Sequence, residues 1–81
     1  MWSLQPLLRS VLDAEGPRRF DAASLRMSPE DFQGVVALIR DAKSRGYLVS
    51  VKEHHSSRSG LIDLVVVEGV TQEGEDYLGS A

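Results

Sequence analysis

The fold is decided by the stretch SPEDFQGVVALIRDAKSRG, residues 28–46. Ser28 is a good helix cap, Pro29 suits the first helical position, and the two acids that follow face the positive end of the helix dipole. Gly46 can end the helix. Between these signals the apolar side chains recur at helical spacing, at Phe32, Val35, Val36, Ile39 and Ala42. The stretch predicts an amphipathic helix over residues 29–45 with one face in a core.

Two further helices are expected upstream of this one. Leucine and valine recur at helical spacing from Leu4 to Leu12, which predicts a helix over residues 3–14 capped by Ser3. Asp21 can cap a second, short helix over residues 22–26. The helix over residues 29–45 is then the third.

Downstream, the pattern changes to that of a β-hairpin. Tyr47, Val49 and Val51 alternate with Ser50 and Lys52, which predicts a half-buried strand. A more continuously apolar strand is expected over residues 61–67. The polar segment 53–60 between them is expected to be a long loop. The second strand has more apolar residues than one buried face requires. Either the first helix covers the excess, or a partner chain or second copy pairs with it.

Two motifs carry a family resemblance. The phrase Arg-Met-Ser-Pro-Glu-Asp-Phe (26–32), the apolar-patterned helix and then Arg-Gly-Tyr-Leu-Val (45–49) resemble the turn, third helix and first wing strand of winged helix-turn-helix proteins. The segment 70–78, in which Thr71 can cap a helix that ends near Leu78, resembles their closing helix. The chain is most similar to YjcQ-type winged-helix proteins of bacteria and phages, and more distantly to PadR-like and MarR-like transcription regulators.

The resemblance implies one α+β winged-helix domain over residues 1–81. Its expected parts are a three-helix core, a two-stranded β-hairpin wing and a short C-terminal helix. It also implies a regulatory DNA-binding function, in which the helix over residues 29–45 enters the major groove and the wing, residues 53–60, contacts the adjacent backbone or minor groove.

Composition limits the other classes of function. The 81 residues include twelve acidic and nine basic residues and no cysteine, for a net charge of -3. All nine basic residues lie before residue 60, so an anionic partner would meet that part of the chain. Without cysteine there is no disulfide or thiolate metal site, and apolar runs such as residues 64–67 are too short to span a membrane. A cytoplasmic protein is expected.

The candidate DNA-binding residues are polar side chains on the third helix, beside the second and on the wing. Two acids on the third helix, Glu30 and Asp41, weaken this hypothesis, because non-specific DNA affinity comes from several unopposed Lys and Arg contacts. The candidates are Arg18, Arg19, Arg26, Gln33, Arg40, Ser44, Arg45, Lys52, His54, His55 and Arg58.

The alternative is a non-enzymatic protein-binding or assembly module. Gly34 and Ala37 on the third helix would let another helix approach as closely as DNA. No enzyme is expected, because adjacent His54 and His55 have no further metal ligand at suitable spacing and no serine has a marked base beside it. No cofactor, metal or small-molecule substrate is implied. Trp2 is expected to cover the core.

Overall fold

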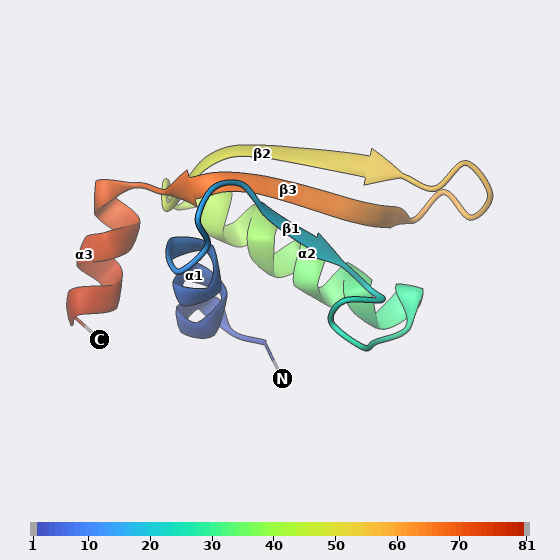
Figure 1. The fold of residues 1–81 in the computed structure, drawn as a ribbon, viewed down its shortest axis with the longest axis horizontal. Helices are drawn as coiled ribbons and strands as arrows, with labels where there is room; N and C mark the ends of the chain where they lie inside the picture. The colour runs from blue at the N-terminus through green and yellow to red at the C-terminus, as the bar shows by residue number, and fades with distance from the viewer. Residues whose placement is uncertain (1, 81) are drawn as a thin grey trace.

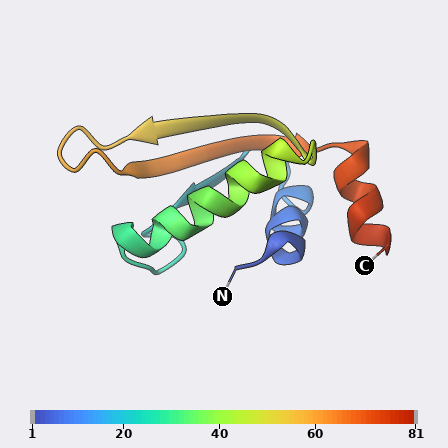
Figure 2. The same ribbon diagram turned by 180° about the vertical axis from the view of Figure 1, so that it is seen from behind.

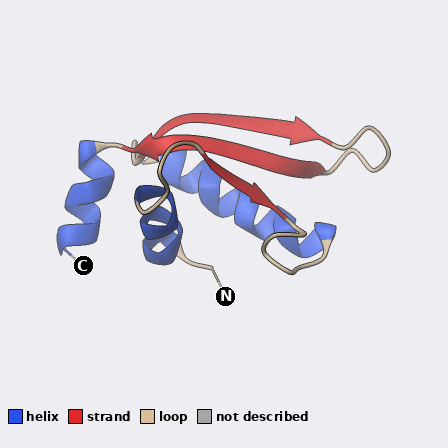
Figure 3. Cartoon of the chain, in the orientation of Figure 1, coloured by secondary structure: helices blue, strands red, loops and turns tan. Residues whose placement is uncertain are grey.

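Helices cover one face of a three-stranded antiparallel sheet in this chain (Figure 1). The computed structural model describes residues 2–80. Figure 3 shows the helices and strands by type, and the chain is of the α+β class. In order, the elements are α1 (Leu4–Leu12), β1 (Arg18–Asp21), α2 (Pro29–Ser44), β2 (Leu48–His55), β3 (Ile62–Val70) and α3 (Gln72–Ser80).

The sheet has the order β1-β3-β2, so β3 is its central strand. Phe20 of β1 lies opposite Val65 of β3, and Glu53 of β2 lies opposite the same valine from the other side. This corrects the expected two-stranded sheet, and it explains why β3 is so apolar. Both of its edges are paired within the chain, and its buried face packs against α1 and α2.

The core lies between the sheet and the helices, and Figure 2 shows the same arrangement from behind. The apolar face predicted for residues 29–45 is confirmed, since all five of its repeating residues are buried. The buried hydrophobic residues are Leu7, Leu8, Val11, Phe20, Phe32, Val35, Val36, Ile39, Ala42, Leu48, Ile62, Val65, Val67 and Leu78.

Local signals fix the ends of α2. The Ser28 hydroxyl accepts a hydrogen bond from the Asp31 N–H at 3.1 Å, as the sequence predicts for a capping serine. At the other end Gly46 adopts φ 81°, and the Tyr47 N–H reaches back to the Ala42 carbonyl at 3.0 Å. This is a Schellman motif, which only a residue tolerant of left-handed backbone can form without strain.

The prediction of a helix over residues 22–26 is wrong, because this segment makes only a single turn. Asp21 does cap it, accepting the Ser24 N–H at 2.6 Å. The turn then ends at once, with Arg26 at φ 55° and the Met27 N–H bonded to the Ala22 carbonyl at 3.0 Å. These bonds close a second Schellman motif directly after the first turn, so no helix follows.

The expected hairpin also needs two corrections. Strand β2 continues through His55, so residues 53–55 belong to the strand and not to the loop. Within β2, Leu48 is buried whereas Val49 is 43% exposed, the reverse of the predicted alternation. Ser50 has a φ of 47°, and this break in the extended backbone shifts the alternation of side chains between the two faces.

Candidate functional site

The two arginines of α2 that were expected to contact DNA form ion pairs with acidic residues. Arg40 donates two hydrogen bonds to the Glu53 carboxylate of β2, at 2.8 and 2.7 Å. Arg45 donates to Asp41, one helical turn earlier, at 3.0 Å. Each pair places an acid beside the base that would meet a phosphate, so these arginines contribute little net positive charge to the surface of α2.

The Arg40–Glu53 pair makes the stability of the domain depend on pH. The hydrogen bonds from Arg40 lower the pKa of Glu53 from its ordinary value of 4.5, although burial of the carboxyl opposes this. The pair's stabilisation is therefore complete above that ordinary pKa, and it is lost as pH falls through the lowered one. We expect Arg40→Met to lower the urea midpoint at neutral pH and to lose this effect in acid.

Glu53→Gln supplies the control for that measurement. With the carboxylate gone, Arg40→Met should change the urea midpoint by the same amount at neutral and acid pH. A pH-dependent difference that persists between Glu53→Gln and the double variant would contradict the role given to this pair.

Gln33 was predicted to be an outward-facing DNA contact. Its side chain instead binds the backbone of a neighbouring strand, which corrects this prediction. Its side-chain amide donates to the Ile62 carbonyl at 2.8 Å, and its side-chain carbonyl accepts from the Ile62 N–H at 3.2 Å. Gln33 therefore pairs with the backbone at the start of β3, where the ladder to β2 is irregular. A side chain with both groups occupied in this way is a poor reader of DNA bases.

We expect Gln33→Leu to destabilise the domain by about 1 kcal/mol. The N–H and C=O groups of Ile62 lose their hydrogen-bond partner, whereas the volume of the side chain at position 33 stays similar. Urea denaturation measures this. Gln5→Leu on α1 is the matched control, since Gln5 is exposed and its replacement should stay within about 0.5 kcal/mol. Equal effects of the two changes would show that Gln33 has no structural role.

The three arginines before α2 are placed differently from one another. Arg18 is part-buried, donates to the Ser10 hydroxyl at 2.9 Å and lies 4.7 Å over the ring of Phe20. Arg19 is exposed on β1, opposite Val66 and so on the face of the sheet away from the helices. Arg26 is exposed in the turn before α2. The structure does not bring these side chains onto one basic surface.

The remaining predicted residues are exposed. Ser44 lies at the C-terminal end of α2, and the others lie on the β2–β3 hairpin, which extends beyond the helices (Figure 1). Within residues 2–80, the four predicted DNA-contacting side chains on this hairpin make no ion pair and no side-chain hydrogen bond. They are Lys52, His54, His55 and Arg58.

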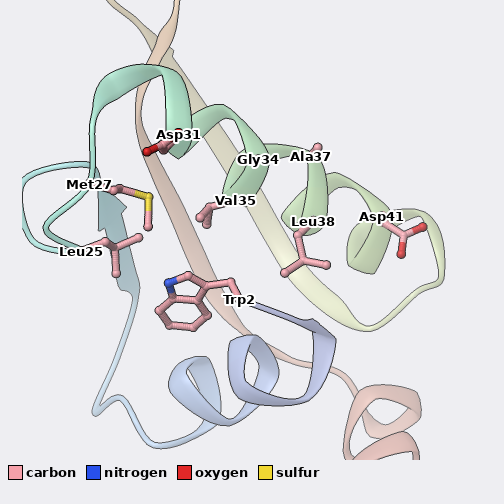
Figure 4. A pocket seen from close by; sticks show the side chains of 9 residues that line it. All are labelled: Trp2, Leu25, Met27, Asp31, Gly34, Val35, Ala37, Leu38 and Asp41. Carbon is pink, nitrogen blue, oxygen red and sulfur yellow. The ribbon is translucent and has the colours of Figure 1, made fainter.

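An apolar groove lies beside α2, and it was not predicted from the sequence. It has a volume of about 900 Å³. Figure 4 shows Trp2, Leu25 and Met27 facing α2 across this groove. The full set of lining residues is Trp2, Leu25, Met27, Asp31, Gly34, Val35, Ala37, Leu38 and Asp41.

The groove exists because the segment before α2 makes one turn and not a helix. Leu25 and Met27 from this segment, with Trp2 from the N-terminus, remain only half-buried against the core. Trp2 packs edge-on against Phe20, with ring centroids 6.1 Å apart, which confirms its expected contact with the core. The opposite wall is the side of α2 that carries Gly34 and Ala37, the two small residues noted in the sequence.

Comparisons of the chain with protein-family models, with curated proteins and with solved structures found no match. None of the helices in residues 2–80 is both long enough and apolar enough to cross a membrane. The same residues contain no group of three or more His, Asp or Glu that could hold a metal ion.

Proposed function

We propose that this chain is a non-enzymatic protein-binding module on a winged-helix scaffold, and that the groove beside α2 is its binding surface. The element order and the sheet order β1-β3-β2, with a hairpin after the long helix, support the winged-helix assignment. The groove supports the protein-binding function. Trp2, Leu25, Met27 and Leu38 are half-buried apolar side chains that line it, and a concave, mostly apolar surface is the usual form of a binding site.

The charges on α2 favour a protein partner over DNA. Its exposed side carries Glu30 and Asp41, and its arginines are paired with Glu53 and Asp41. A helix that enters a DNA groove needs unopposed donors and positive charge at this surface. Here acids interrupt the basic residues, and the groove beside α2 is lined mainly by apolar side chains.

Selection from a displayed library of short random peptides tests the proposal. We expect the full chain to enrich peptides that bind with micromolar affinity and that fail to bind Ala37→Arg, in which a long charged side chain fills the groove. Ser44→Arg is the matched control. It lies seven residues further along α2, on the same side of the helix but beyond the groove, and should leave binding unchanged.

Two results would contradict a binding groove at this place. One is a library that yields no binder, and the other is binders that are insensitive to Ala37→Arg. Circular dichroism should show that both variants are folded, because both replaced residues are exposed on a helix and arginine is a good helix former.

DNA binding through the hairpin is the second candidate, and one observation favours it. The four cationic or titratable hairpin side chains, Lys52, His54, His55 and Arg58, are exposed without an ion-pair partner in the described chain. Binding of a labelled random duplex at low and moderate salt tests this. Steeply salt-dependent binding that weakens in Lys52→Ala and Arg58→Ala, but not in Arg40→Ala, would support it. No binding at low salt would exclude it.

A further inference from the structure

The partner of the groove can be specified further, on the assumption that the proposed protein-binding function is correct. We infer that the groove takes an amphipathic α-helix of about three turns from another protein, with a Lys or Arg near each end. Its apolar face would enter the groove. The inference depends on the position of the charges, the length of the groove and the nature of its walls.

The charge of the partner follows from the acids of the groove. Among residues 2–80, the two charged side chains that line it are both carboxylates, Asp31 and Asp41. Arg45 forms an ion pair with one oxygen of Asp41, so this end of the groove is less negative than the Asp31 end, and the second oxygen of Asp41 can still accept a hydrogen bond from a ligand. Within the same range, Asp31 has no ion pair. A partner with basic ends is therefore complementary, and one with acidic ends is repelled.

The length of the partner follows from the spacing of these acids. They are ten residues apart on one helix, so they stand about 15 Å apart along its axis. A small ligand cannot meet both, because binding sites for small molecules gather their polar groups around one point. An α-helix of about three turns has this length, and its first and last turns would lie beside the two carboxylates.

The walls of the groove favour a helix over an extended peptide. Helix α2 and the apolar side chains of Trp2, Leu25 and Met27 offer no strand edge with which a peptide backbone could pair. An extended peptide would bury unsatisfied N–H and C=O groups there, whereas a helix satisfies its own. Gly34 has no atom within 4 Å of where a Cβ would stand, so another helix can approach α2 closely.

A second copy of this chain does not fit the groove. Three of the apolar residues of α1, Leu7, Leu8 and Val11, are buried in its own core, which leaves no apolar stripe on its surface. Helix α3 carries three acids, which the carboxylates of the groove would repel, at Glu73, Glu75 and Asp76. Within residues 2–80 no exposed helix has an apolar stripe with a base at each end. The helices of the described chain therefore do not supply the occupant, and the inferred partner is another protein.

Three synthetic peptides of about 14 residues, or four turns, test this inference. Each has leucines at helical spacing. The first has lysine near both ends, the second has glutamate at the same positions, and the third has the lysines and a central proline that prevents a helix. Fluorescence anisotropy with the full chain measures affinity. We expect the lysine-ended helix to bind about tenfold more tightly than the glutamate-ended one at low salt.

Variants of the chain assign this preference to the two acids. We expect Asp31→Lys with Asp41→Lys to reverse the preference, and Asp31→Asn with Asp41→Asn to abolish it. Glu75→Lys, which changes the net charge by the same amount as the asparagine pair but lies on α3 away from the groove, should preserve it. The asparagine pair keeps the measurement decisive if the double lysine variant does not fold.

The outcomes separate this inference from the proposed function. Equal affinity of the lysine-ended and glutamate-ended peptides, or tight binding of the proline peptide, would overturn the inferred partner. If the random library still yields binders blocked by Ala37→Arg, the groove remains a protein-binding site for a partner of other chemistry. If neither the designed peptides nor the library bind, both proposals are wrong.

Discussion

Val36→Asp is expected to unfold the domain. Val36 lies in the middle of α2 and is only 2% exposed, and aspartate at this position would place a charge among apolar side chains. Such a group costs more than about 4 kcal/mol when it has no partner. A domain of this size has a total stability of roughly 4–12 kcal/mol. Far-ultraviolet circular dichroism and the dispersion of amide NMR signals should both show the loss of structure.

Ala37→Asp is the matched control for this change. The same charge is introduced one residue later on the same helix, but the side chain at position 37 is exposed. We expect a folded protein that loses only the difference in helix propensity, about 0.7 kcal/mol. Arg58→Ala on the hairpin should likewise stay within about 0.5 kcal/mol. A folded Val36→Asp protein would show that the buried face of α2 has been wrongly assigned.

The elements that the sequence predicts well are those whose signals are local. Ser28 caps α2 and Gly46 ends it, and both contacts involve residues at most five positions away. Thr71 likewise caps α3 by accepting the Gly74 N–H at 3.1 Å. Such signals need no knowledge of distant segments, which is why the bounds of these helices agree closely with the predicted ones.

Two parts of the fold differ from the prediction, one because of a distant strand pairing and the other because of a local turn. Strand β1, residues 18–21, has no clear alternation and is a strand because β3, more than forty residues later, pairs with it. The turn over residues 22–27 has adequate helix propensity, yet it closes after one turn with Arg26 in a left-handed conformation. Propensity is a weak guide wherever tertiary packing decides the conformation.

In the candidate site, too, the sequence reveals residue types but not the contacts that they make in the folded chain. The positions of polar residues on the predicted helix identify Arg40 and Gln33 as possible DNA contacts, but they cannot show that Glu53 and Ile62 already bind these side chains. The groove is formed by residues 2–41 and is lined by side chains that, in the sequence, look like ordinary core. The one sequence signal for it was the pair of small residues, Gly34 and Ala37, on the exposed side of α2.

Gly74→Ala is expected to destabilise the domain by about 1–3 kcal/mol, because α3 packs too closely for a side chain at this position. A Cβ built at Gly74 would lie 2.5 Å from a methyl carbon of Val70 and 2.6 Å from the Tyr47 carbonyl oxygen. The methyl group can move, but the carbonyl belongs to the backbone and accepts the Thr71 N–H at 2.9 Å. Urea denaturation measures the change in the free energy of unfolding.

Gly79→Ala in the same helix is the matched control, since a Cβ there would meet no atom within 4 Å. Its expected effect is opposite in sign, a gain of about 0.5–1 kcal/mol from better helix propensity. The same gain is present in Gly74→Ala, so the difference between the two variants isolates the cost of the close approach. Because Tyr77 of α3 stacks on Tyr47 at 5.0 Å, moving α3 away should also change tyrosine fluorescence. Equal stability of the two variants would mean that α3 does not pack against the start of β2.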